Sequence, residues 1–241
     1  MKMQYGATPE GQKELEQKIG YTFHNKALLK QALTHSSYAN EIKILKSEDY
    51  ERLEFLGDAV LELVSSDFLF SEYPQMPEGK LSKLRASLVC EAALAYTAHQ
   101  LGLERYFLLG KGEESTGGRE RPAIACDVVE AVIGAIYLDS GLEEARKFIF
   151  SFILDDIETR HLFYDAKSTL QEYVQGSSQG QLAYRIIYEK GPEHDKEFGV
   201  ELTLDGRVLG RGEGHNKKAA EQQAAYQALR KLHKEDGMTC T

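Results

Sequence analysis

The sequence lacks long hydrophobic runs and contains few cysteines. No apolar segment approaches the roughly 18 residues that span a bilayer, and the N-terminal stretch MKMQYGATPEGQKELEQ has no apolar core of a signal peptide. We therefore expect no membrane segment and no export. The three cysteines, Cys90, Cys126 and Cys240, are far apart, so the spacing matches neither a disulfide framework nor a metal site. A reduced, cytoplasmic setting is the simplest interpretation.

Positive charge is in deficit as well. The chain has 29 Lys and Arg against 38 Asp and Glu, a net charge of −9, which taken alone argues against a partner that is a polyanion. The deficit is uneven, because residues 1–165 carry 18 basic and 27 acidic side chains whereas residues 166–241 carry 11 of each. If the acidic part contacts a polyanion, bound divalent cations or a separate binding module must offset the repulsion.

The hydrophobic pattern changes near residue 160. Before it, apolar residues three and four apart predict helices over residues 27–38, 50–72, 79–101, 125–139 and 142–156. The stretch 109–122, rich in glycine and charge, is expected to be a loop. After the polar segment 158–167, the pattern predicts a helix over 168–176, strands over 182–190, 197–204 and 207–215, and a helix over 217–234. Asp205-Gly206 is a hairpin signal between the last two strands. The sequence thus predicts an all-α unit followed by a small α+β unit of order α-β-β-β-α.

Two of the predicted helices carry grouped carboxylates. At about 100° per residue, Glu51, Glu54, Asp58 and Glu62 fall within a wedge of about 80° on a helix that is otherwise mostly apolar. A solvated stripe is an equally good interpretation for Glu51 and Glu62 alone. The pattern therefore singles out one helix face without deciding its role.

The second group is Asp127 and Glu130, the charged residues of a long apolar run with no basic partner on the same helix. Gly134 continues their face, where a missing side chain would let another helix approach. Buried carboxylates are costly unless they are paired or bind a metal. If the two helices face each other, four carboxylates without thiols or clustered histidines suit Mg²⁺ or Mn²⁺ rather than zinc. Such a site suits phosphodiester hydrolysis.

These motifs resemble those of a known family. Residues 51–61 (ERLEFLGDAVL) resemble the signature of the ribonuclease III family, and Gly117-Gly118-Arg119 with residues 127–131 (DVVEA) resemble its second carboxylate motif. The resemblance covers nearly the whole chain. It implies an all-α endonuclease domain over residues 8–158, a linker over 159–165 and a double-stranded-RNA-binding domain over 166–235. It further implies a homodimer that cuts double-stranded RNA with Mg²⁺, leaving 5′-phosphate and 3′-hydroxyl ends, and no small-molecule substrate.

The resemblance also implies roles for individual residues. The metal ligands would be Glu54, Asp58, Asp127 and Glu130, with Asp58 and Glu130 as the catalytic positions, while Glu51 and Glu78 would line the cleft. For Glu78, an acid favoured at a helix start is an equally good interpretation. Cys126 departs from the family's usual alanine, and its small size should leave the metal site intact. Glu62 matches no family position, so we expect a structural role, as we do for His35.

Three patches of the second unit resemble a double-stranded-RNA-binding domain: residues 168–172 (STLQE), 191–194 (GPEH) and 215–222 (HNKKAAEQ). Gln171, Glu172 and His194 would bond 2′-hydroxyls in the minor groove. Lys217 and Lys218, in the first turn of a helix, would attract phosphates, although a solvated lysine pair is the alternative. Ala183 and Asn216 depart from a common proline and serine, and Arg211 is expected to be a solvated arginine at a strand end.

Two other functional classes fit the sequence less well. An RNA-binding protein with a retired nuclease fold would be expected to lose metal carboxylates, yet all four are present. A phosphohydrolase of small molecules would leave the C-terminal module unexplained. The resemblance implies ribosomal RNA precursors as substrates, with messenger and transfer RNA precursors as further candidates.

Overall fold

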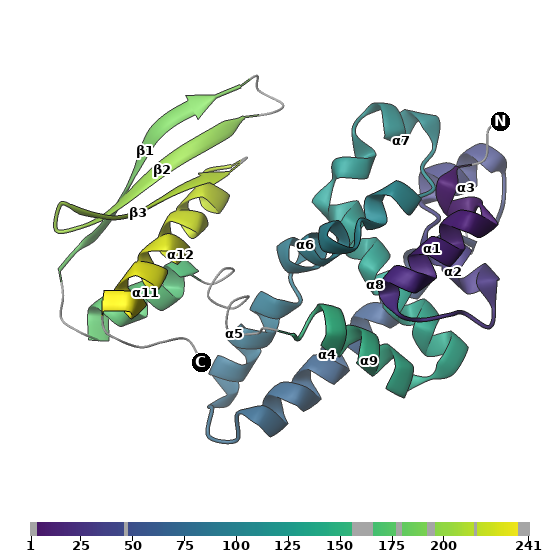
Figure 1. Ribbon diagram of the computed structural model, residues 1–241, viewed down its shortest axis with the longest axis horizontal. Helices are drawn as coiled ribbons and strands as arrows, with labels where there is room; N and C mark the ends of the chain where they lie inside the picture. Colours follow the sequence, from purple (N-terminus) through teal and green to yellow (C-terminus); the bar gives the residue numbers. More distant parts are fainter. Residues whose placement is uncertain are drawn as a thin grey trace. The chain divides into compact units, whose positions relative to one another are not determined.

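The chain divides into two units, Met1–Ile157 and Glu158–Thr241. The computed structural model, shown in Figure 1, describes residues 4–45, 48–155, 166–176, 180–191, 196–214 and 216–235. Each unit has its own hydrophobic core: one is built from residues between 15 and 154, the other from residues between 166 and 232.

In the described part of the first unit, every secondary-structure element except an isolated β-bridge is a helix. Its α-helices are α1 (Pro9–Ile19), α2 (Lys26–Ala32), α3 (Ser36–Ile42), α4 (Glu51–Glu72), α5 (Glu78–Leu88), α6 (Glu91–Leu101), α7 (Lys111–Ser115), α8 (Pro122–Ser140) and α9 (Leu142–Phe152). Short 3-10 helices cover Tyr5–Ala7, Leu103–Tyr106 and Gly118–Glu120. None of the helices in the described part of the chain combines the length and the apolar character that crossing a membrane requires.

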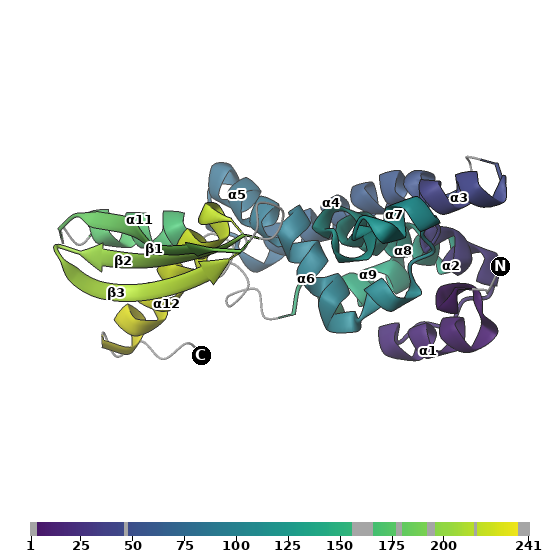
Figure 2. The ribbon, with the colours of Figure 1, turned by 90° about the horizontal axis from the view of Figure 1, so that it is seen from above.

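Helix α8 is the centre of this unit. It packs against α2, α4, α6 and α9, and Figure 2 shows it between these neighbours. Proline is favoured in the first turn of a helix, as at Pro122, because its missing N–H has no helical partner there. Since α8 is apolar on almost all sides, residues such as Val129, Val132 and Ile136 are completely buried. Surrounding helices therefore fix the direction in which its few charged side chains point.

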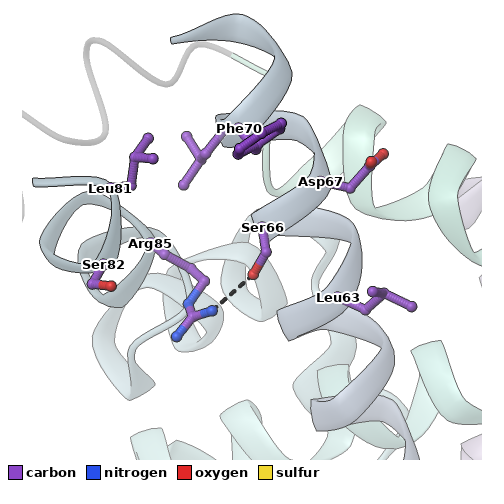
Figure 3. Close-up of a pocket in the computed structure, with 8 residues that line it drawn as sticks. Leu63, Ser66, Asp67, Phe70, Leu81, Ser82 and Arg85 are labelled. Carbon is purple, nitrogen blue, oxygen red and sulfur yellow. Dashed lines mark hydrogen bonds between the residues drawn. The ribbon is translucent and has the colours of Figure 1, made fainter. Parts of the chain in front are cut away.

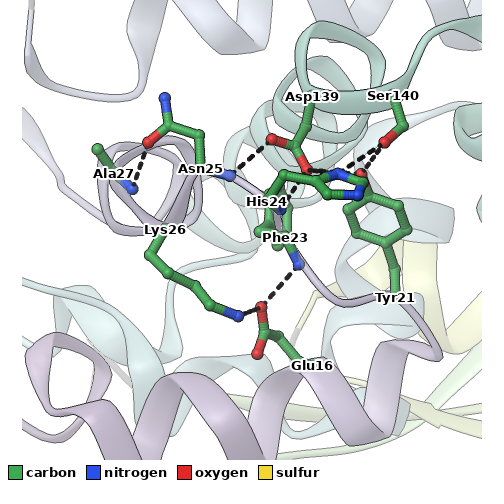
Figure 4. A network of polar contacts seen from close by, with 9 residues as sticks. All are labelled: Glu16, Tyr21, Phe23, His24, Asn25, Lys26, Ala27, Asp139 and Ser140. Carbon is green, nitrogen blue, oxygen red and sulfur yellow. Dashed lines mark hydrogen bonds and ion pairs between the residues drawn. The ribbon is translucent and has the colours of Figure 1, made fainter.

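A polar network fixes the far end of α8 (Figure 4). The Asp139 carboxylate accepts hydrogen bonds from the Tyr21 hydroxyl at 2.7 Å and from the backbone N–H groups of His24 and Asn25 at 2.8 and 2.9 Å. Burial alone would raise the pKa of Asp139, but these hydrogen bonds outweigh it and lower the pKa to about 2. On α1, buried Glu16 accepts from the Phe23 backbone N–H at 2.8 Å. The network therefore ties the loop between α1 and α2 to α8.

Two predicted helices are interrupted in the structure. The helix expected over residues 27–38 breaks after α2, because Thr34 forms a parallel bridge with Leu108 and the His35 backbone N–H donates to the Leu108 carbonyl at 3.1 Å. The helix expected over residues 79–101 breaks at Val89 and Cys90. Apolar periodicity continues across that break because both halves bury leucines. The expected loop 109–122 also contains α7.

The second unit is an α+β domain, so the predicted fold class is confirmed for both units. Helix α11 (Ala166–Gly176) precedes strands β1 (Leu182–Lys190), β2 (Glu197–Leu204) and β3 (Arg207–Gly214), and α12 (Lys217–Glu235) follows them. The sheet is antiparallel in the order β1-β2-β3, and α11 and α12 lie on one face of it (Figures 1 and 2).

Glycines and a tight turn shape this sheet. Asp205 and Gly206 have φ angles of 48° and 84°, as the predicted turn between β2 and β3 requires. A Cβ at Gly212 would lie 2.3 Å from the Ala220 carbonyl oxygen, and one at Gly210 would lie 2.3 Å from that of Ala224. Helix α12 can therefore approach β3 closely, and its first turn is held at the end of that strand.

Candidate functional site

Helices α4 and α8 cross at two glycines. A Cβ on Gly57 would lie 1.7 Å from the Glu130 carbonyl oxygen, and a Cβ on Gly134 would lie 2.2 Å from the Leu53 carbonyl oxygen. Side chains cannot be accommodated at such distances, so glycine at both positions lets the two backbones touch. The carboxylates on either side of the crossing, two from each helix, are thereby brought to one place.

The carboxylates of the two helices influence one another's ionisation. Burial raises the pKa of Glu130 to about 8, and the charges of Asp58, Glu54 and Asp127 contribute in the same direction. Burial likewise raises the pKa of Glu54 to about 7, with the charges of Asp127, Glu51 and Asp58 adding to it. The four predicted metal ligands therefore form one electrostatic group across the crossing, although they are far apart in the sequence.

Asp127 has an additional partner, Tyr50, which directly precedes α4. The Tyr50 hydroxyl donates a hydrogen bond to Asp127 Oδ2 at 3.0 Å. Burial raises the pKa of Asp127, and this hydrogen bond acts in the opposite direction. The contact joins residues 77 positions apart, so no local pattern in the sequence could have indicated it.

The donor set fits a hard divalent cation. Among the described residues, no lysine or arginine forms an ion pair with Glu54, Asp58, Asp127 or Glu130. Negative charge is thus concentrated at the crossing without a basic partner, and it adds to the effect of burial on the pKa values of Glu54 and Glu130. A cation bound by these oxygens would neutralise that charge, and carboxylate oxygens are the ligands that Mg²⁺ and Mn²⁺ accept.

Cys126 is closer to this site than the sequence indicated. Its Sγ lies 3.9 Å from Glu130 Oε1, and one ligand atom each of Cys126, Asp127 and Glu130 lie within 4.8 Å of one another. Burial, followed by the charges of Glu130 and Asp127, raises the pKa of the Cys126 thiol. A protonated thiol is a poor ligand for a hard cation. Of the three groups, the carboxylates of Asp127 and Glu130 are therefore the ones whose chemistry suits a hard cation.

The remaining acidic residues have different surroundings. Glu51 is the exposed first residue of α4 and contributes to the raised pKa of Glu54. Glu78 begins α5, where it accepts a hydrogen bond from Ser82 Oγ at 2.8 Å. Glu62 forms an ion pair with Arg85 at 2.8 Å, which supports the structural role expected for it. Glu51 thus acts electrostatically on the predicted ligand Glu54.

Apolar side chains and a groove lie further along α4. Phe55, Leu63 and Phe70 are 81%, 57% and 75% exposed. Leu63 and Phe70 line a groove of about 410 Å³ between α4 and α5, shown in Figure 3, together with residues that include Leu81 and Arg85. Arg85 holds the two helices together through Ser66 Oγ, to which it donates at 2.8 Å. The exposed apolar surface of α4 therefore coexists with a firmly packed helix pair.

The second unit presents the predicted polar residues at its surface. Gln171 and Glu172 are exposed on α11, and Lys217 and Lys218 are exposed in the first turn of α12. The Asn216 side chain caps α12 by accepting from the Ala219 backbone N–H at 2.8 Å, as its cap propensity predicts. His194, also predicted to bind, lies outside the described residues.

Arg211 is not a merely solvated strand-end residue. It bonds the Glu201 carboxylate through Nε at 3.0 Å and Nη2 at 2.8 Å. Arg185 of β1 bonds the other carboxylate oxygen at 2.8 Å. The pairing register places these residues opposite one another across three strands, which sequence periodicity alone does not specify. Arg211 is therefore part of an ion-paired cluster on the sheet.

Comparison with known proteins gives the same two-part organisation. Residues 25–157 match a family described as Ribonuclease-III-like, and residues 166–232 match the Double-stranded RNA binding motif. A nuclease unit followed by a double-stranded-RNA-binding unit defines the class of double-stranded-RNA endonucleases. The proteins named Ribonuclease 3 from Bacillus licheniformis and Bacillus velezensis are 53% and 52% identical, over 92% of this chain and 90% of theirs. The chain belongs to the ribonuclease III family.

A solved structure agrees for the first unit. The nuclease domain of ribonuclease III from Campylobacter jejuni is 46% identical in sequence, with a TM-score of 0.55. The match covers 58% of this chain and 94% of that domain. That nuclease domain has structural flexibility in a region involved in dimer formation.

Proposed function

We propose that this endoribonuclease hydrolyses phosphodiester bonds of double-stranded RNA with Mg²⁺ held between α4 and α8. The supporting observation is the glycine crossing, which gathers Glu54, Asp58, Asp127 and Glu130 into one electrostatic group. Mn²⁺ is expected to substitute, because the donors are the same oxygen atoms. The products would carry 5′-phosphate and 3′-hydroxyl ends.

The proposed division of labour follows from the chemistry of the residues. The four carboxylates bind and orient the cation, with Asp58 and Glu130 at the catalytic positions. A bound divalent cation lowers the pKa of water and offsets the charge of the phosphate. Glu51 and Glu78 are proposed to line the cleft. Without the cation, the same carboxylates would repel the RNA backbone.

The second unit is proposed to hold the duplex. Gln171, Glu172 and His194 would bond 2′-hydroxyls, while Lys217 and Lys218 would contact phosphates. The two lysines lie in the first turn of α12, where the helix dipole also favours an anion. Recognition would depend on duplex shape rather than on base sequence.

We further propose a homodimer formed through the exposed apolar surface of α4. Phe55 and Leu63 are large, apolar and more than half exposed, which marks an interaction surface when such residues are contiguous. Dimer formation itself is supported by the Campylobacter jejuni nuclease domain, which has a region involved in dimer formation. Light scattering at micromolar concentration should give twice the chain mass; a monomer mass for the active enzyme would exclude the dimer.

The proposed setting is the cytoplasm, with ribosomal RNA precursors as substrates and messenger and transfer RNA precursors as further candidates. A direct test of the reaction compares a long RNA duplex, single-stranded RNA and a DNA duplex, each with Mg²⁺ and with EDTA. We expect cleavage of the RNA duplex alone, and only with Mg²⁺. Cleavage in EDTA, or equal cleavage of single strands, would contradict the proposal.

The site assignment is tested with Asp127→Asn and Glu130→Gln. Each variant keeps its size but loses a negative ligand, so cleavage should be abolished while duplex binding persists. Glu62→Gln is the matched control, because Glu62 lies on the same face of α4 as the ligands but is paired with Arg85. Cleavage by Glu130→Gln at the wild-type rate in Mg²⁺ would remove Glu130 from the site.

A further inference from the structure

Tyr50 is a buried residue whose hydroxyl forms a hydrogen bond with a predicted metal ligand. It is 3% exposed, and its hydroxyl donates to Asp127 Oδ2 at 3.0 Å. Tyr50 precedes the first residue of α4, whereas Asp127 lies on α8. The hydrogen bond therefore connects the start of one ligand-bearing helix to a ligand on the other.

The position of Tyr50 is fixed from two sides. Its backbone N–H donates to the Thr34 carbonyl at 2.9 Å, and the His35 ring lies against its ring with centroids 5.6 Å apart. His35 is itself held, because its Nδ1 accepts from the Ser37 backbone N–H at 3.1 Å. Ser37 Oγ in turn accepts from the Gly110 backbone N–H at 2.9 Å. Packing and hydrogen bonds thus leave the phenol little freedom to move away from Asp127.

We propose that Tyr50 is a positioning residue, which holds the Asp127 carboxylate in one orientation through its hydroxyl and so increases the affinity of the site for its cation. The inference rests on the proposed metal-binding function of Asp127. Because the hydroxyl bonds Oδ2, it restrains rotation of the carboxylate, which would hold Asp127 ready for a cation. Partners of this kind, which hold a ligand without touching the metal, typically contribute about 10–100-fold in metal affinity or activity.

A purely structural role for Tyr50 makes a different prediction. If the ring only filled space in the core, removing the hydroxyl would leave cation affinity unchanged. Tyr50→Phe keeps the ring and removes the hydroxyl. Tyr38→Phe is the matched control, since Tyr38 is a buried tyrosine on the neighbouring helix α3. Both variants remove one hydroxyl from a buried tyrosine, and only the hydroxyl of Tyr50 bonds a predicted ligand.

The experiment measures Mn²⁺ binding to the RNA-free full-length protein by calorimetry, and duplex cleavage across a Mg²⁺ series. For Tyr50→Phe we expect cation affinity to fall about 10-fold. The Mg²⁺ concentration for half-maximal cleavage should rise by the same factor, while the rate at saturating Mg²⁺ is retained. Tyr38→Phe should match the wild type. Cooperative thermal unfolding in EDTA checks that both variants are folded; the midpoint of Tyr50→Phe should be the lower of the two, because it loses a buried hydrogen bond.

Three results would overturn the inference. Wild-type cation affinity in Tyr50→Phe would show that the hydroxyl does not position Asp127. A lower rate at saturating Mg²⁺, with an unchanged Mg²⁺ concentration for half-maximal cleavage, would show that the hydroxyl does not act through cation affinity. If both tyrosine variants lost the same cation affinity, the cause would be a general weakening of the core and not the hydrogen bond to Asp127. Failure of the wild-type protein to bind any divalent cation would instead refute the proposed function on which the inference depends.

Discussion

Single residues of the site carry charge that the rest of the fold leaves largely uncompensated. Glu54 and Glu130 have pKa values of about 7 and 8, compared with a usual value near 4.5. Burial is the main cause in both cases, and neighbouring carboxylates add to it. A fold that keeps such groups together loses stability when they ionise, unless a cation is bound.

This leads to a prediction about pH. Between the unfolded pKa near 4.5 and the folded values of about 7 and 8, the native state binds more protons than the unfolded state. Stability contributed by these groups is therefore full below pH 4.5 and is lost as pH rises to about 8.

Cation binding opposes this loss, since it requires the ionised carboxylates. The increase in unfolding temperature caused by Mg²⁺ should thus be small at pH 6 and larger at pH 8.5. Differential scanning calorimetry of the full-length protein in Mg²⁺ and in EDTA measures it. An Mg²⁺ effect that is constant across this pH range would contradict the pKa shifts.

At the scale of elements, the glycine crossing decides whether α4 and α8 can share a site. Gly134→Ala places a methyl group 2.2 Å from the Leu53 carbonyl oxygen, which must separate the helices. We expect a loss of about 1–3 kcal/mol in the free energy of unfolding, together with weaker cation binding. Chemical denaturation measures the first effect and calorimetry the second.

Gly79→Ala is the control for this prediction. A Cβ on Gly79, in α5, meets nothing within 4 Å, and alanine favours a helix over glycine by about 1 kcal/mol. This substitution should therefore leave stability unchanged or raise it. If both substitutions changed the free energy of unfolding equally, glycine at the crossing would not be required for the close approach of α4 and α8.

The first turn of α12 gives a second prediction at this scale. Lys217→Ala combined with Lys218→Ala removes two exposed cations from the helix start. Duplex affinity should fall, and the dependence of binding on salt should decrease by about one unit of slope per lysine. Lys231→Ala, at the other end of the same helix, is the control. An unchanged salt slope in the double variant would exclude phosphate contacts there.

Much of the element structure could be predicted from periodicity, and the exceptions have physical reasons. The carboxylate faces of α4 and α8 follow from helical geometry and residue spacing alone. The break between α5 and α6 does not, because buried leucines continue through it. The hydrogen bond from Tyr50 to Asp127, the contact of Cys126 with Glu130 and the ion pairs of Glu201 all depend on which elements become neighbours. One sequence contains no direct signal for such tertiary proximity.

At the scale of the whole molecule, two cores imply two separable functions. The first unit contains all four predicted metal ligands, and the second contains the predicted duplex contacts. Removal of residues 166–241 should leave a folded fragment that still cuts duplex RNA at low salt, though with lower affinity. Cleavage assays across a salt series measure this. Complete inactivity of a folded, dimeric fragment would show that the nuclease unit does not suffice for cleavage.

The central claim is that α4 and α8 hold one divalent cation between their carboxylates. Anomalous diffraction from crystals of the full-length protein grown in Mn²⁺ tests it most directly. We predict a manganese peak bonded to carboxylate oxygens of both helices, drawn from Glu54, Asp58, Asp127 and Glu130, and not to Cys126 Sγ. A fully occupied manganese site elsewhere in the crystal, with no manganese peak between α4 and α8, would contradict the claim.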